Sequence, residues 1–200
     1  TTRDTVIVAE ISSFQLETIH SFCPQVSAIL NITPDHLNRH HTMENYIAVK
    51  ESITKNQNGF HTCVLNYEDS ILRRFGERLM TNVVFFSSAR RLERGVSLFA
   101  DEIHYANAKV DVVVCRTGEL QLIGKHNYEN VMAAVAMAIS FGAPLEVIRG
   151  VVKKFRAVEH RIEYVTEKNG VVYYNDSKGT NPDAAIRGIQ AMNRPTVLIG

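Results

Sequence analysis

A chain of 200 residues can bury the hydrophobic core of one large domain, or of one and a half ordinary ones. Its 22 basic and 21 acidic residues nearly cancel, so the charge predicts neither a nucleic-acid nor a membrane partner, and no stretch approaches the roughly 18 apolar residues of a membrane helix. Three widely spaced cysteines argue against a disulfide framework and a zinc ribbon and favour a reducing, cytoplasmic setting: Cys23, Cys63 and Cys115.

The first half of the chain alternates strand and helix patterns. Apolar runs predict four strands, over residues 5–10, 26–33, 62–66 and 82–87. Helical patterns fall between them, over residues 42–57 and 69–80, and Ser12 with Gln15 forms a capping-box pattern that predicts a short helix after the first strand. This alternation implies an α/β fold with a mainly parallel sheet that is covered by helices on both faces.

From residue 95 the pattern changes, because short strand-like runs follow one another with no room for crossover helices. They predict a small antiparallel sheet, over residues 96–99, 102–105, 110–115 and 119–123. An almost entirely apolar helix is expected over residues 127–141, ending at Gly142, and Pro144 suits the first turn of another helix that runs to about Lys154.

A domain boundary is expected near residues 156–160. Beyond it Asn169-Gly170 predicts a β-hairpin, and a helix from Pro182 and a strand over residues 196–199 follow. We therefore predict one domain over residues 1–157 and the start of a second over residues 158–200, which is too small to hold much core alone. Because the chain begins without Met and stops directly after a strand pattern, we expect it to be part of a longer protein.

Two polar residues follow the first two predicted strands. Glu10 ends the first strand, and His36 comes shortly after the second. In open parallel sheets ligands bind beyond the carboxyl ends of the strands, so these side chains converge if the strands are neighbours, and with substrate phosphates they could complete a Mg²⁺ site. The alternative is that Glu10 caps a helix or makes an ion pair and that His36 is a turn residue.

Lys50 lies on the face of a predicted helix that should meet the core, since Met43, Tyr46, Lys50 and Ile53 recur at spacings of three and four. A lysine at a domain edge can lay its stem over apolar surface and keep its charge in water. The other interpretation is a desolvated amine with a lowered pKa, able to act as a nucleophile or to be covalently modified. The spacing leaves both open.

Two later stretches bring polar residues to the starts of predicted helices. Asn127 and Asn130 lie three apart, where their amides can cap the apolar helix or reach a ligand. Asp176, Lys178 and Thr180 lie between a strand end and a helix N-terminus, which makes either an anion site or a solvated turn.

Five motifs occur in the order and approximate spacing of the Mur ligases, which the chain resembles over nearly its whole length: EISSFQLE, NITPDHLNRH followed by Lys50, GKHNYEN, EHR and NDSKGTNPDAA. The resemblance implies a P-loop-type central domain followed by the beginning of a Rossmann-like C-terminal domain. It also implies an ATP-dependent amide ligase of peptidoglycan synthesis, similar to the branch that joins D-glutamate to UDP-N-acetylmuramoyl-L-alanine through an acyl phosphate. We expect a monomer.

The same resemblance implies roles for the candidate residues. Glu10 and His36 would be ligands of two Mg²⁺ ions, and Lys50 would be carried as a carbamate beside them. Four residues would contact ATP, at its adenine, phosphates and ribose: Asn127, Asn130, Arg161 and Asp176. Three residues would face the muramoyl substrate or D-glutamate: Ser12, Lys178 and Thr180.

Two family features are absent from these 200 residues: the phosphate-binding loop of form GxxxxGK[ST], expected before Thr1, and the N-terminal uridine-binding domain. We therefore expect no ligase activity and weak ATP binding from this chain alone. Two alternatives remain, a ligase that resembles folylpolyglutamate synthetase and a degenerate, non-catalytic nucleotide-binding or scaffold protein. A GKT-type loop in the parent sequence would favour an enzyme over the degenerate protein.

Overall fold

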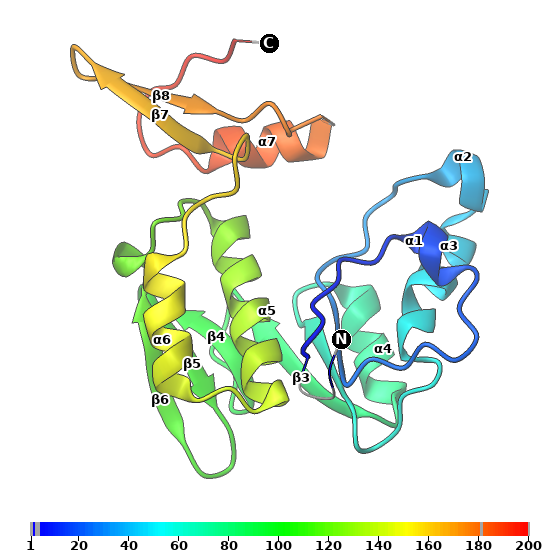
Figure 1. The fold of residues 1–200 in the computed structure, drawn as a ribbon. Helices are drawn as coiled ribbons and strands as arrows, with labels where there is room; N and C mark the ends of the chain where they lie inside the picture. The colour runs from blue at the N-terminus through cyan, green and yellow to red at the C-terminus, as the bar shows by residue number, and fades with distance from the viewer. Residues whose placement is uncertain (1, 3–4, 181, 200) are drawn as a thin grey trace.

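The computed structural model describes residue 2, residues 5–180 and residues 182–199, and Figure 1 shows its elements in chain order. Six strands form one sheet in sequential order: β1 (Val26–Ile29), β2 (Thr62–Asn66), β3 (Asn82–Ser87), β4 (Gly95–Phe99), β5 (Glu102–Ala106) and β6 (Asp111–Arg116). Neighbours from β1 to β4 are parallel, and the pairs β4–β5 and β5–β6 are antiparallel. The predicted α/β class is confirmed, and the strands over residues 62–66 and 82–87 have the predicted bounds.

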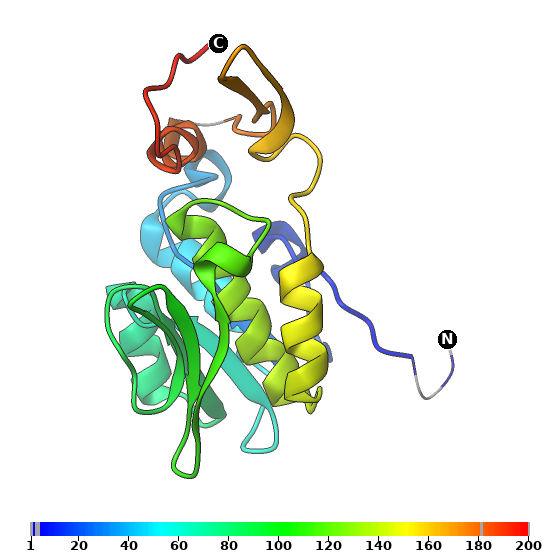
Figure 2. The ribbon, with the colours of Figure 1, turned by 90° about the vertical axis from the view of Figure 1, so that its left-hand side faces the viewer.

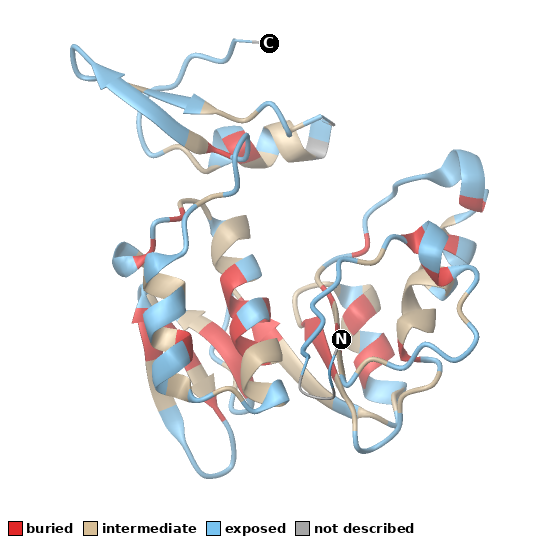
Figure 3. Ribbon diagram, in the orientation of Figure 1, coloured by how far each residue is buried: buried red, intermediate tan, exposed pale blue. Residues whose placement is uncertain are grey.

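Helices cover both faces of the sheet: α5 (Lys125–Phe141) and α6 (Leu145–Lys154) lie on one face, and α3 (Met43–Glu51) and α4 (Ser70–Arg78) on the other. The short helices α1 (Ser13–Leu16) and α2 (Leu37–His40) pack on α3, and 3₁₀ turns lie at Ser52–Thr54 and Thr117–Glu119. Val64 of β2 packs in the core beside α5, whereas its neighbours Cys63 and Leu65 pack with Leu72 and Phe75 of α4. Since successive strand residues point to opposite faces, β2 separates two hydrophobic cores, and Figure 3 shows buried residues on both α5 and α4.

The C-terminal part forms a small antiparallel sheet of its own, β7 (Glu163–Lys168) and β8 (Val171–Asn175), followed by α7 (Pro182–Gln190). The predicted hairpin is confirmed: Asn169 and Gly170 both have positive φ, 53° and 79°, as a tight hairpin turn requires. Figures 1 and 2 both show this part beyond the end of α6. The division into residues 1–157 and 158–200 stays a prediction, and residues 1 and 200 lie outside the described ranges.

Three predicted strands do not form. Residues 5–10 are irregular, and Val6, Ile7 and Val8 are 57%, 75% and 88% exposed; Figure 2 shows this segment extending away from the sheet. Residues 196–199 are irregular and exposed as well. An apolar run indicates a preference for burial, but a strand also needs a partner for its backbone N–H and C=O groups.

The third missing strand lies over residues 119–123, where the chain makes a 3₁₀ turn and then an irregular segment. Leu120 and Leu122 nevertheless reach the core beside α5. The alternation of apolar residues here therefore indicates which side chains are buried, although the backbone does not pair with another strand. The predicted antiparallel pairing over residues 95–116 is confirmed, but β4 also pairs with β3, which joins these strands to the main sheet. The helix expected over residues 42–57 ends at Glu51.

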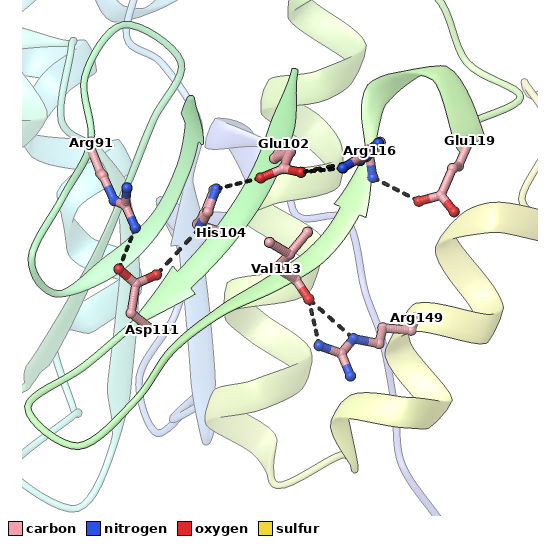
Figure 4. A network of polar contacts seen from close by, with 8 residues as sticks. All are labelled: Arg91, Glu102, His104, Asp111, Val113, Arg116, Glu119 and Arg149. Atoms are coloured by element: carbon pink, nitrogen blue, oxygen red, sulfur yellow. Dashed lines mark hydrogen bonds and ion pairs between the residues drawn. The ribbon is translucent and has the colours of Figure 1, made fainter. Parts of the chain in front are cut away.

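A polar network covers the outer face of β5 and β6 (Figure 4). The ring of His104, which is buried, lies between two carboxylates, with Nδ1 3.3 Å from Asp111 Oδ1 and Nε2 3.3 Å from Glu102 Oε2. Arg91 and Arg116 pair with the same two carboxylates. On α6 the Nε of Arg149 donates to the Val113 carbonyl at 3.2 Å, which holds this helix against the edge strand.

Within the described part of the chain, every helix is too short or too polar to cross a lipid bilayer.

Candidate functional site

The segment after β1 is attached to the carboxyl edge of the sheet at two backbone positions. Asn66, the last residue of β2, donates from Nδ2 to the Leu30 carbonyl at 3.1 Å. Asp69, the N-cap of α4, accepts at Oδ2 from the N–H of Ile32 at 2.8 Å. Because ligands of parallel sheets bind at this edge, the attachment fixes the start of the segment that carries the candidate residues.

Asp35 and His36 follow, and His36 is the N-cap of α2 with a left-handed backbone (φ 53°, ψ 28°) that few residues other than glycine adopt. Its N–H donates to Asp35 Oδ1 at 2.8 Å, and its Nε2 lies 3.6 Å from Asp35 Oδ2. The imidazole lies against Phe14 of α1, with ring centroids 4.9 Å apart. Both polar side chains are about half exposed, so they are available to a ligand.

Lys50 lies in the last turn of α3, on the face that the spacing predicted. Met43, Tyr46 and Ile53 of that face pack in the core beside α4, and the Lys50 amine lies 5.4 Å from the centre of the Tyr46 ring. Burial lowers the pKa of this amine, although the negative charge of Asp35 opposes the shift. The direction of this shift agrees with the desolvated interpretation, which stays a prediction.

Glu10 is not brought to this group. It is exposed and lies in the irregular N-terminal segment, because the strand that was expected to carry it does not form. Among the described residues, no three His, Cys, Asp or Glu side chains gather as a metal-binding set. The donors predicted for Mg²⁺ are thus not assembled in this arrangement of the chain, and the expected convergence of Glu10 with His36 is not seen.

Two features beside Lys50 and His36 escaped the sequence analysis. One is Asp35, whose charge acts on Lys50; it stands in the TPDH motif, and only the fold brings it near the lysine. The other is a buried hydrogen bond between α1 and α2, which joins Ser13 Oγ and His40 Nε2 at 3.0 Å. The two residues of that bond are 27 positions apart in the sequence, so no local spacing pattern predicts the contact. Ser12, next to Ser13, forms the predicted capping box with Gln15.

A second group of candidate residues lies around the start of α5. Asn127 is half-buried and donates from Nδ2 to the Ile123 carbonyl at 2.7 Å, while Asn130 is exposed one turn later. The N-cap of α5 is Gly124, with φ of 93° and no side-chain cap, so neither asparagine caps the helix. A Cβ at Gly124 would lie 2.5 Å from Cβ of Ala191, which shows how closely the end of α7 approaches this helix start.

Asp176 lies between the hairpin and α7. Its Oδ1 accepts from the N–H of Ile162 at 3.0 Å, and a Cβ at Gly188 would lie 2.5 Å from its Oδ2. Burial lowers the pKa of His126 on α5, as does the charge of Arg187, whereas Asp176 acts in the opposite direction. Asp176 is therefore near the start of α5, as a shared site with Asn127 would need.

The three other predicted residues of this region are exposed, namely Arg161, Lys178 and Thr180. The N–H of Lys178 donates to the His160 carbonyl at 3.0 Å, which keeps the loop after β8 beside the segment before β7. Apart from Glu10, the candidate residues thus fall into two groups, one on α1 to α3 and one at the junction of α5, the hairpin and α7. Their roles remain predictions.

The chain is similar in sequence to known ligases. The model of the Mur ligase middle domain family matches residues 1–138. UDP-N-acetylmuramoylalanine--D-glutamate ligase of Lachnoclostridium phytofermentans is 62% identical over 200 residues, which is 100% of this chain and 44% of that protein. The enzyme of the same name from Clostridioides difficile is 46% identical over 197 residues, 98% of this chain and 44% of its own length. The chain thus spans less than half the length of these curated relatives.

Solved structures share the fold at low identity. MurF from Acinetobacter baumannii superposes with a TM-score of 0.63 at 20% identity, covering 82% of this chain and 36% of that one. MurF from Thermotoga maritima, solved in complex with ADP, gives 0.61 at 20% identity and covers 84% and 39%. MurC from Thermotoga maritima gives 0.63 at 22% identity and covers 90% and 39%.

Proposed function

Since this chain belongs to the Mur ligase family, we propose that it works as part of an ATP-dependent ligase that joins D-glutamate to UDP-N-acetylmuramoyl-L-alanine in peptidoglycan synthesis. One observation carries the proposal: 62% identity over all 200 residues with a curated ligase named for that reaction. Because the chain spans 44% of that relative's length, the activity belongs to a longer protein. The three cysteines, all free, agree with a cytoplasmic enzyme.

The proposed reaction has two steps. ATP transfers its γ-phosphoryl group to the carboxylate of the alanine, giving an acyl phosphate and ADP. The amine of D-glutamate then attacks the acyl carbon, the amide bond forms, and phosphate leaves with the C–O electron pair. Such a pathway depends on positioning and on charge placed where charge develops, more than on covalent chemistry by the protein.

Lys50 is the residue whose environment best supports its proposed role as a carbamate. The reaction joins the unprotonated amine to CO₂ through a new N–C bond and releases a proton to solvent, so it needs an amine with a lowered pKa. Burial lowers the pKa of Lys50. The carbamate would replace a cation by an anion near Asp35. When bound, two Mg²⁺ ions would neutralise phosphate charge. Their proposed ligands are Glu10, His36 and the carbamate of Lys50, and the described residues do not assemble a metal-binding set in this arrangement.

The second group of residues is proposed to bind nucleotide and substrate. Asn127 and Asn130 would face the adenine and phosphates of ATP, and Arg161 and Asp176 its phosphate and ribose. Support comes from the approach of Asp176 to His126, the residue before Asn127. Ser12 would contact the muramoyl substrate, and Lys178 and Thr180 would face D-glutamate, across the predicted domain boundary. We propose that the enzyme is a monomer.

The test uses the complete protein that contains this chain. We expect ADP release that requires both UDP-N-acetylmuramoyl-L-alanine and D-glutamate, and a product whose mass equals the sum of the substrates minus one water. L-Glutamate is the matched control for the amine, and UDP-N-acetylmuramate with L-alanine is the control for the branch of the family. Turnover of a folate with glutamate would contradict the proposal. So would ATP binding with no turnover of UDP-N-acetylmuramoyl-L-alanine with D-glutamate or of a folate with glutamate.

A further inference from the structure

We propose that His40 is a positioning residue that holds α1 against α2 and thereby sets the place of Ser12 relative to His36. The inference rests on the proposed function, because Ser12 and His36 face substrate and cation only under that proposal. His40 itself lies under the surface, with 4% of its area exposed, and touches no reacting group.

Both ring nitrogens of His40 face an oxygen on the segment that forms α1. Nε2 lies 3.0 Å from Ser13 Oγ, and Nδ1 lies 3.5 Å from Glu17 Oε1. Ser13 is also buried, at 5% exposure, so this bond is shielded from water. A buried hydrogen bond of this kind is expensive to break, because each polar atom left behind has no water to replace its partner.

Ring packing and an ion pair also stabilise the contact between α1 and α2 around His40. The His40 ring stacks on Phe14, with centroids 5.8 Å apart and an interplanar angle of 19°, and it lies 5.2 Å from the Tyr46 ring of α3. Arg39 donates to both oxygens of Glu17, from Nε at 3.2 Å and Nη2 at 2.6 Å. This pairing lowers the pKa of Glu17 and keeps an anion beside the His40 ring.

The elements that carry the site residues are too short to hold their own positions. α1 and α2 have four residues each, whereas isolated helices shorter than about 12 residues are marginal in water. Ser12 caps α1 directly before Ser13, and His36 caps α2 four residues before His40. The two caps are therefore linked through the Ser13–His40 bond, and Figure 1 shows α1, α2 and α3 grouped at one end of the molecule.

The experiment uses the complete ligase and compares His40→Leu with His40→Gln. Leucine fills similar space without polar atoms, whereas the glutamine amide can still reach the Ser13 hydroxyl. We expect His40→Leu to raise KM for UDP-N-acetylmuramoyl-L-alanine about tenfold, which corresponds to about 1.4 kcal/mol, while KM for ATP changes by less than about twofold. His40→Gln should restore most of the affinity. His20→Ala, which changes an exposed histidine in the loop between α1 and β1, should match wild type.

A merely structural role would give a different result. Loss of folded enzyme lowers kcat and leaves both KM values unchanged, and that outcome would overturn the proposal. Ser13→Ala should add little to His40→Leu, because both remove the same bond; multiplied effects would also overturn it. If the wild-type enzyme is inactive, the proposed function fails, but amide hydrogen exchange still tests whether His40 holds α1 against α2. The amides of residues 13–17 should then exchange faster in His40→Leu than in His40→Gln. Equal exchange in the two variants would overturn the positioning role of His40.

Discussion

Asp69 links α4 to the segment that carries Asp35 and His36, and its replacement by alanine should lower the free energy of unfolding by about 3 kcal/mol. Oδ1 accepts from the N–H of Ile71 at 2.9 Å and of Leu72 at 3.2 Å, which caps α4. Oδ2 accepts from the N–H of Ile32 at 2.8 Å. One carboxylate therefore serves two elements that are far apart in the sequence.

The magnitude is the sum of two losses. Replacing a capping aspartate by alanine costs about 1 kcal/mol. Ile32 is only 5% exposed, so its N–H would lose its acceptor where water does not replace it, at a cost of about 1 to 3 kcal/mol. Against a total stability of about 5 to 15 kcal/mol, this change is large.

Asp69→Asn is the matched variant. Asparagine caps helices about as well as aspartate, but its NH₂ group cannot accept, so one of the two sets of bonds is lost. We expect about half the effect of alanine. Thr42→Ala removes bonds within one helix only, since Thr42 Oγ1 accepts from the Asn45 N–H at 3.2 Å and the hydroxyl also bonds Glu44 in the same first turn, and it should cost about 1 kcal/mol.

Urea unfolding followed by far-ultraviolet circular dichroism measures these differences, because the chain has no tryptophan for fluorescence. The m-value should stay constant across the variants, which confirms that stability alone has changed. A loss below about 1 kcal/mol for Asp69→Ala, or an equal loss for alanine and asparagine, would refute the assignment of two roles to this carboxylate.

Four further predictions concern other sites. Lys50→Ala in the complete ligase should lower turnover at least about 100-fold, with partial recovery by added short carboxylates; unchanged turnover would remove the lysine from the mechanism. Burial raises the pKa of Cys63 and of Cys115 to about 11, so iodoacetamide should label Cys23 first, as mass spectrometry can check. Because unfolded thiols lose their protons first, the free energy of unfolding should also fall as pH rises from about 9 toward 11. Gly95→Ala should destabilise by more than about 2 kcal/mol in thermal melts, since φ is 127° and its Cβ would lie 2.1 Å from a backbone oxygen of β3.

Local patterns in the sequence determine the parts of the structure that could be predicted from it. The strands over residues 62–66 and 82–87 are apolar runs between turn residues, and the hairpin at Asn169-Gly170 needs two positive φ angles that these residues adopt readily. The stripe through Lys50 also faces the core as its spacing predicted. In each case one stretch of the chain contains the whole signal.

The failures share a cause. Residues 5–10 have the composition of a buried strand, but composition does not say which edge will pair with it. The expected position of Glu10 depended on that pairing and failed with it. Asp35 beside Lys50, and Ser13 with His40, are contacts between separate elements, so they become visible only after the sheet order is known.

His36 lies in a segment that is anchored at both ends. The Ile32 N–H is bound to Asp69 on the sheet side, and His40 is bound to Ser13 on the α1 side. Only a few residues separate the two anchors, and His36 between them keeps a left-handed backbone that costs free energy in an unrestrained chain. Such a conformation persists when the surrounding structure over-determines it. Under the proposed role of His36 as a cation ligand, the anchors order the backbone of this segment in advance, so that binding would not need to supply the free energy of ordering it.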